Sequence, residues 1–129
     1  MKLKVMAALT LLVTTGIAGT QRDTPNHYSN LKVLPKNVSS KILSHIMIDE
    51  FEDGLGVSCN FCHAKENNSN KLDYASDAKP EKEIARSMMR MTMNINKKFF
   101  QLKHPLLGDS TIIVTCSTCH HGQPHPYNE

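Results

Sequence analysis

The sequence predicts a mainly α-helical fold with long connecting loops, built from two helix–loop repeats. Apolar side chains recur every three or four residues in two stretches, around 40–51 and 80–102, as expected for amphipathic helices. A loop follows each stretch and leads to a Cys-x-x-Cys-His motif, at Cys59–His63 and at Cys116–His120. The two motifs contain all four cysteines of the 129-residue chain, so both repeats end in the same chemistry.

The first predicted helix begins near Ser39 or Ser40, either of which can cap its N-terminus. Its apolar positions lie at helical spacing and are Ile42, Leu43, Ile46, Met47 and Phe51. Gly54 is expected to end this helix, and a short loop then leads to Cys59. Residues 65–78 follow the first motif, are rich in Asn, Ser and Asp, and are expected to form a solvated loop.

The second predicted helix has the stronger periodicity. Asp77 can cap its N-terminus, Pro80 lies in its first turn, and Pro105 is expected to end it. One apolar stripe runs along the helix and consists of Ile84, Met88, Met91, Ile95, Phe99 and Leu102. Residues 106–115 are expected to form a loop or a short strand that leads to the second motif.

The Cys-x-x-Cys-His motif has the residue types that attach c-type haem. Two thiols three positions apart can add to the two vinyl groups of one porphyrin, and the histidine that follows lies under the iron. The predicted haem-attaching cysteines and proximal ligands are Cys59, Cys62, His63, Cys116, Cys119 and His120. The sequence therefore predicts two covalently bound haem c groups and a dihaem c-type cytochrome fold.

The cysteines could instead form a zinc site, a redox-active pair or two disulfides. Four thiolates can hold one zinc ion, but such a site does not require the histidine that follows each pair. A redox-active cysteine pair belongs on a strand-to-helix turn within a βαβ pattern, which this sequence lacks. Two disulfides remain an alternative in an exported protein.

The N-terminus predicts export. Lys2 and Lys4 precede the apolar stretch Val5–Val13, and small residues follow it. We expect residues 1–20 to be a signal peptide, cut after Ala18 or slightly later, and residues 21–129 to be the dihaem domain. An uncleaved signal acting as an anchor stays open. The expected location is the periplasm or the outer face of the cytoplasmic membrane.

Composition narrows the classes of function. Residues 21–129 contain 13 basic and 12 acidic residues, and the propionates of two haems would add negative charge. Nucleic-acid binding therefore gains no support. The chain has no tryptophan, three tyrosines and four phenylalanines, so two porphyrins would supply apolar bulk that a small core otherwise lacks.

Each iron of an electron carrier needs a sixth ligand, and a methionine thioether raises the reduction potential. Met47 on the first helix is favoured, with His45 as a rival on the opposite face. The second helix has four methionines, of which at least three must be packing residues, namely Met88, Met89, Met91 and Met93. Periodicity alone does not separate Met88 from Met91.

A family resemblance is carried by the motifs and the residues around them. The segment Leu55–His63 resembles a haem-binding segment of the cytochrome subunit of photosynthetic reaction centres. Met91-Thr92 and Ile95-Asn96, followed by Val114–Gly122, resemble another such segment. The resemblance covers residues 31–124 and implies that a methionine-bearing helix lies over each porphyrin. It also implies Met47 and Met88 as the distal ligands.

The sequence departs from that family in three ways. Full-length members carry four haems, whereas this chain has sites for two, and His121 stands where an arginine often follows the motif. His104 is near the place of a family histidine that ligates a further haem, but it is offset in register. We therefore expect a half-size, stand-alone relative, and docking to a reaction centre is not implied.

The expected function is that of an exported dihaem cytochrome. It would carry one electron at a time between respiratory or photosynthetic-type redox partner proteins, peripheral to the membrane or anchored there, and would not be an enzyme. The alternative is a dihaem peroxidase-like enzyme or a haem sensor with one open iron site. His27, His104 and His125 are expected to have no ligand role.

Overall fold

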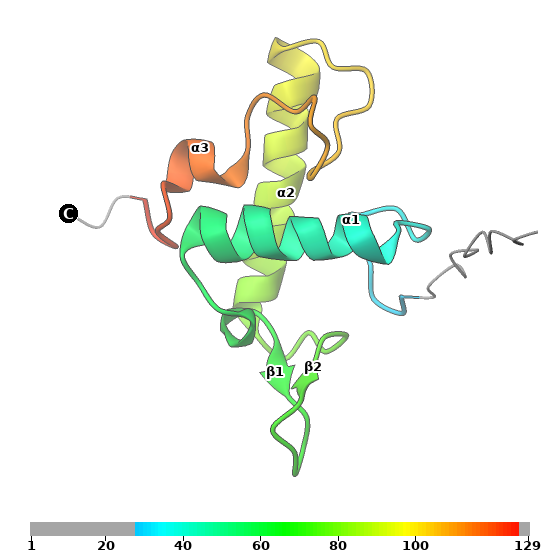
Figure 1. Ribbon diagram of the computed structural model, residues 1–129, viewed down its shortest axis with the longest axis vertical. Coiled ribbons are helices and arrows are strands. Elements are labelled where there is room, and N and C mark those ends of the chain that lie inside the picture. The colour runs from blue at the N-terminus through cyan, green and yellow to red at the C-terminus, as the bar shows by residue number, and fades with distance from the viewer. Residues whose placement is uncertain (1–27, 127–129) are drawn as a thin grey trace, which may run out of the picture.

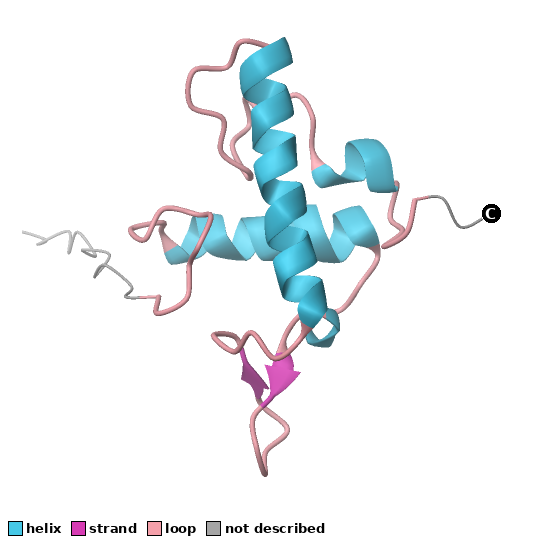
Figure 2. Ribbon diagram, turned by 180° about the vertical axis from the view of Figure 1, so that it is seen from behind, coloured by secondary structure: helices cyan, strands magenta, loops and turns pink. Residues whose placement is uncertain are grey.

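Two crossed helical rods make up most of the fold. The computed structural model describes residues 28–126. The longer rod is α2 (Pro80–Phe99), and the other joins α1 (Ser40–His45) to η1 (Ile46–Asp53) without a break (Figure 1). Figure 2 shows the same crossing from behind, with α2 nearest the viewer. The predicted mainly helical fold is confirmed for the part of the chain that is described.

Four short elements complete the described structure. The turn η2 (Cys59–Phe61) and the helix α3 (Cys116–His120) both lie within the cysteine motifs, and the sequence had not predicted either of them. The strands β1 (Ala64–Lys65) and β2 (Leu72–Asp73) pair antiparallel, with Ala64 opposite Asp73. The stretch expected to be a solvated loop therefore contains a small ribbon, which lies at the lower end of the molecule in Figure 1.

The first rod begins and ends where it was predicted to. The Ser39 hydroxyl accepts a hydrogen bond from the Ile42 amide over 3.3 Å and caps α1. The following η1 is wound as a π-helix, a form that is rare and often found at functional sites. It ends at Asp53, and Gly54 is its C-cap, as expected. Gly54 itself keeps helical φ and ψ, and the chain turns at Gly56, whose φ is +65°.

The second rod differs from prediction at both ends. Lys79, and not Asp77, precedes the first helical residue, and it makes no side-chain cap. Asp77 is instead engaged in ion pairs. The helix ends at Phe99, well before Pro105, because the chain enters the left-handed region at Gln101 with φ +57°. Residues 106–115 form a loop, one of the two forms expected.

The core lies where the rods cross. Its buried apolar residues are Leu34, Ile46, Met89 and Leu107. Along α2 the buried face also carries polar side chains at Arg86, Thr92 and Asn96, whereas the apolar stripe is largely exposed. In most surface helices the apolar stripe faces the core and the polar side chains face solvent, and α2 shows the opposite distribution. An exposed apolar stripe of this kind indicates a binding surface.

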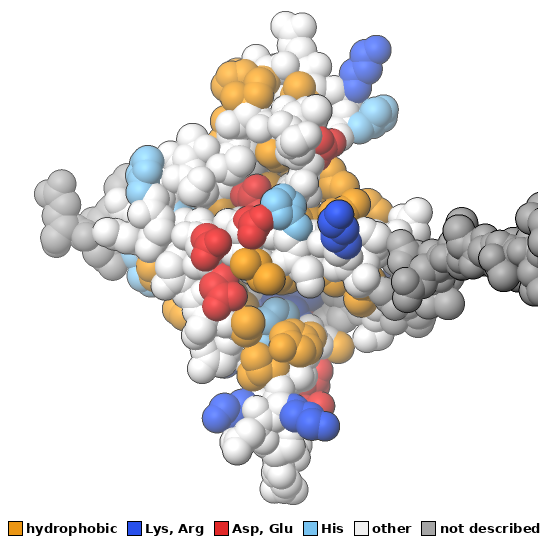
Figure 3. Space-filling model, in the orientation of Figure 1, with side chains coloured by type: hydrophobic (Ala, Val, Ile, Leu, Met, Phe, Trp, Pro, Cys, Tyr) orange, Lys and Arg blue, Asp and Glu red, His pale blue; other side chains and the backbone are white. Residues whose placement is uncertain are grey.

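The surface is divided by charge. Acidic side chains gather over the outer face of the first rod, where Asp49 and Asp53 are exposed, and basic ones flank the ribbon (Figure 3). Within residues 28–126, no helix is both long enough and apolar enough to cross a membrane. The predicted signal peptide, residues 1–20, lies outside the described residues and stays a prediction.

Candidate functional site

The first motif is exposed at its start and half-buried at its end. Cys59 is exposed, whereas Cys62 and His63 are half-buried. The Lys79 ammonium, just before α2, donates to the backbone carbonyls of Asn60 and Phe61, the latter over 3.4 Å. A positive charge therefore holds the backbone between the two cysteines. Burial raises the pKa of the Cys62 thiol, which keeps it protonated.

His63 packs against Tyr74, whose ring and backbone both interact with it. Its ring meets the Tyr74 ring edge-on, with the centroids 5.0 Å apart. Its Nδ1 atom is buried and has no hydrogen-bond partner among the described residues. Burial lowers the pKa of His63, and the positive charge of Lys82 lowers it further. Both effects favour the neutral imidazole, which is the form that binds a metal.

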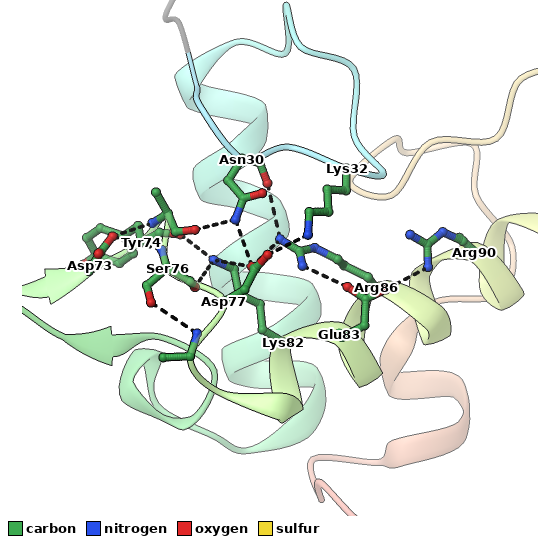
Figure 4. Close-up of polar contacts among 12 residues, drawn as sticks. Asn30, Lys32, Asp73, Tyr74, Ser76, Asp77, Lys82, Glu83, Arg86 and Arg90 are labelled. Atoms are coloured by element: carbon green, nitrogen blue, oxygen red, sulfur yellow. Dashed lines mark hydrogen bonds and ion pairs between the residues drawn. The ribbon is translucent and has the colours of Figure 1, made fainter.

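The loop that carries Tyr74 is fixed to α2 by Lys82. The Lys82 ammonium is mostly buried and donates to the carbonyls of Tyr74 and Ser76 over 2.8 Å and 2.6 Å (Figure 4). Lys82 therefore positions the aromatic ring that contacts His63. This role was not predicted, because the sequence around Lys82 shows only a charged residue on a helix.

Asp77 is the centre of an ion-pair network beside this loop. It accepts hydrogen bonds from Arg86 over 2.8 Å, from Lys32 over 2.6 Å and from Asn30 over 2.9 Å (Figure 4). The Arg86 bond contributes most and, with Lys32, holds the pKa of Asp77 well below its usual range. The network fastens the segment around residue 30 to α2, because Arg86 is buried there and also pairs with Glu83.

The second motif is a short helix with two caps. Thr115 and Thr118 form a capping box, in which the Thr115 amide donates to the Thr118 hydroxyl over 3.0 Å. The Glu50 carboxylate, from η1, accepts a hydrogen bond from the buried Cys116 amide over 3.0 Å. Burial and the Glu50 charge raise the pKa of the Cys116 thiol to about 12. Cys119 is exposed.

His120 makes a hydrogen bond through Nδ1, the ring atom that has no partner in His63. Its Nδ1 lies 2.9 Å from the Gln123 carbonyl. A carbonyl only accepts, so Nδ1 carries the proton and Nε2 keeps its lone pair. This arrangement fixes both the tautomer and the direction of the ring, as at metal-binding histidines.

Asn96 positions the approach to the second motif. Its amide nitrogen donates to the carbonyls of Thr92 and Val114, and its oxygen accepts from the amides of Ile113 and Val114. The side chain is fully buried. An asparagine inside a predicted helix was a signal for such a role, since this residue is a poor helix former.

The two motifs meet at the end of the first rod. The Gly122 amide, just after α3, donates to the Gly54 carbonyl over 3.0 Å. Gly54 is buried against the second motif, and a Cβ atom placed on it would lie 3.4 Å from the Cys116 Cβ, an ordinary packing distance. The rod that carries Met47 therefore supports the second motif directly.

The methionines of α2 fall into two groups. Met89 is 5% exposed and belongs to the core, and Met93 packs against it. Met88 and Met91 are 41% and 47% exposed. On the other rod Met47 is half-buried, and its rival His45 pairs through Nδ1 with Asp49. His104 and His125 are exposed, and His27 lies outside the described residues.

The residues fit covalently attached haem. All four cysteines are free thiols. The exposed large side chains of α2 form one apolar face long enough for a flat ring, and they are Ile84, Met88, Met91 and Phe99. His120 presents an oriented nitrogen for an iron. In residues 28–126, no three His, Cys, Asp or Glu side chains come together as a metal-binding cluster.

Comparison with known families gives the origin of this arrangement. A family model described as "Photosynthetic reaction centre cytochrome C subunit" matches residues 5–129. The chain belongs to this family. Membership in a cytochrome c family implies covalently bound haem c, and the resemblance inferred from the motifs is confirmed.

Two curated relatives of this reaction-centre cytochrome family are similar to the chain. Cytochrome c-554 of Chloroflexus aurantiacus (strain ATCC 29366 / DSM 635 / J-10-fl) is 32% identical over 96 residues, covering 74% of this chain and 21% of that protein. The photosynthetic reaction center cytochrome c subunit of Rubrivivax gelatinosus (strain NBRC 100245 / IL144) is 30% identical over 95 residues, covering 67% and 22%. The chain thus spans about a fifth of these relatives' length. No solved structure matches.

Proposed function

We propose that the chain is an exported dihaem c-type cytochrome that carries single electrons between redox proteins. One haem is attached at Cys59 and Cys62, and the other at Cys116 and Cys119. The iron ligands are His63 with Met47, and His120 with Met88. The family supports haem and electron transport in general, and the chain's own residues support this more specific assignment.

The exposed apolar face of α2 is the observation that carries the proposal. Four large apolar side chains stand in solvent on a helix whose opposite face is buried. Burying one such side chain fully is worth about 1.5–3 kcal/mol, so leaving four of them in water is costly. A porphyrin held against this face would cover these side chains, and Met88 would supply its thioether to the iron.

Polar contacts favour Met47 over His45 on the first rod. His45 is occupied by Asp49 on the next turn, whereas the Met47 thioether has no charge partner to give up. A thioether ligand also keeps the potential high. Glu50 and Gly54 contact the second motif, so the neighbouring stripe that carries Met47 is left for the first haem.

The protein's own residues hold the proposed haem ligands in fixed positions. The haem supplies an iron that changes between ferrous and ferric states. His120 is held in one tautomer by the Gln123 carbonyl, and His63 is held by the Tyr74 ring. Asn96 and Glu50 keep the second motif against the rods, so little rearrangement accompanies a change of iron charge.

Intact mass and optical spectroscopy test the assignment. The mature protein should carry two haems and should begin after the predicted signal peptide. Oxidised protein should show the weak far-red band of methionine-to-iron ligation, and reduced protein should not bind carbon monoxide. Rapid carbon monoxide binding by one haem would favour the peroxidase-like or sensor alternative and refute the pure carrier.

The proposed partners are redox proteins outside the cytoplasm. One similar protein is named as a reaction center cytochrome subunit, which supports a redox protein at a membrane surface as the kind of partner. Electron exchange with candidate donors and acceptors, followed by stopped-flow absorbance, tests this proposal.

A further inference from the structure

The charges that act on His63 of the first motif and on Cys116 of the second motif are opposite in sign, although Glu81 places a negative charge near Cys62. At the second motif, the Glu50 carboxylate is 8% exposed and binds the Cys116 amide. At the first motif, Lys79 binds the backbone between the cysteines, and Lys82 is the largest charge acting on His63. Glu50 lies on η1, which carries Met47, the proposed ligand of the first haem. Lys82 lies on α2, which carries Met88, the proposed ligand of the second haem, and Lys79 directly precedes α2. Each rod therefore brings a charge to one motif and the distal methionine to the other.

The acidic groups near the first motif do not cancel its positive charge at His63. Asp73 opposes Lys82 and Arg86 there, but its effect on His63 is smaller than that of either. Asp77 is itself neutralised by Arg86 and Lys32. Lys82, whose ammonium is mostly buried and holds the Tyr74 carbonyl beside the ring, is therefore the main charge at His63.

The proximal histidines differ in the same direction. His120 donates its Nδ1 proton to the Gln123 carbonyl, which makes the imidazole a stronger electron donor. The His63 Nδ1 atom is buried and has no partner among the described residues, so it lacks the short bond that orients His120, although the Tyr74 backbone also interacts with His63. A stronger donor stabilises the ferric iron and lowers the reduction potential. A weaker donor does the opposite.

Charge acts on the iron by the same rule. Oxidation adds one positive charge, which a nearby carboxylate stabilises and nearby ammonium or guanidinium groups oppose. Hydrogen bonding and charge are independent features of the structure, and both separate the two irons in the same order.

We propose, on the basis of the dihaem function above, that the haem at Cys116–His120 has the lower reduction potential and the haem at Cys59–His63 the higher. Glu50 is the tuning residue of the lower-potential haem. An electron on the second iron then passes to the first: the ferrous second iron becomes ferric, and the ferric first iron becomes ferrous. When the protein holds one electron, that electron is found mainly on the first haem.

Nuclear magnetic resonance of partly reduced wild-type protein tests the order directly. The first haem can be recognised by the contact of its histidine with the Tyr74 ring. Its resonances should become diamagnetic first as electrons are added. If the resonances of the second haem change first, the order is wrong. This measurement needs no substitution, so it does not depend on the folding of a variant.

A charge variant tests the role of Glu50. Glu50→Gln keeps an oxygen that can accept the Cys116 hydrogen bond but removes the charge, so the lower potential should rise and the gap between the two should narrow. Glu52→Gln removes an equal charge from the same rod and is the matched control, because it is Glu50 whose side chain binds the Cys116 amide. Spectroelectrochemical titration measures both potentials.

The outcomes separate this inference from the proposed function. A larger rise of the higher potential in Glu50→Gln, or equal effects of the two substitutions, would overturn the tuning role. Fewer than two haems by intact mass would refute the dihaem function itself. Two haems in the reversed order would refute the inference alone.

Discussion

Replacing Asn96 by alanine should loosen the approach to the second motif and destabilise the fold. The substitution removes four hydrogen bonds and leaves the amides of Ile113 and Val114, and the Val114 carbonyl, without partners. A buried group left unsatisfied costs about 1–3 kcal/mol, and the lower figure applies where water can reach the loop. We expect the free energy of unfolding to fall by about 3–5 kcal/mol.

Urea unfolding of the haem-loaded protein, followed by far-ultraviolet circular dichroism, measures this loss. With an m-value of about 1–3 kcal/mol/M, the midpoint should fall by more than about 1 M. Asn94→Ala is the matched control, because Asn94 is exposed on the same helix and both substitutions gain the same helix propensity. If the two variants unfold within about 1 kcal/mol of each other, the reasoning is refuted.

Three further substitutions test other parts of the structure. Met88→Ala should abolish part of the far-red methionine band, whereas Met91→Ala should leave it unchanged. Asp77→Asn should make stability less dependent on pH, because the folded pKa of Asp77 lies below its unfolded value and its contribution is present at neutral pH but lost on acidification. Gly56→Ala should destabilise the protein by more than about 1 kcal/mol, since its φ is +65° and the new methyl would collide with the Gly122 carbonyl.

A specific result would contradict each of these three predictions. Loss of the band with Met91→Ala but not with Met88→Ala would assign the ligand to Met91. Equal changes of the urea midpoint between pH 7 and acid in wild type and Asp77→Asn would show that the ion-pair network does not stabilise the fold. Wild-type stability of Gly56→Ala would mean that the two loops can separate at no cost.

The sequence predicted what local spacing controls. The two long helices, the Ser39 cap and the position of the motifs all follow from residues close together in the chain. Asp77 was misassigned as a helix cap because its role depends on distant partners. It binds Arg86 and Lys32, so tertiary contacts overrode the local preference for a cap.

The candidate site was predicted only in part for the same reason. Periodicity placed Met88 on an apolar stripe but did not show that this stripe is exposed while Met89 is buried. Glu50 had no local signal, because an acidic residue on a helix is ordinary until Cys116 is brought to it by the fold. The ligand assignments, Met47 and Met88 included, stay predictions that the spectroscopic tests address.

The contact of Gly54 and Gly56 with Gly122 affects whether the two repeats can exist separately. The repeats are similar in sequence plan, yet Gly56 lies against the Gly122 carbonyl and Gly54 accepts the Gly122 amide, so the backbone of one repeat closes on that of the other. Two halves expressed as separate polypeptides would each expose a face that only the other half covers. The two-motif unit is therefore the smallest piece that can be inherited, duplicated or transplanted intact.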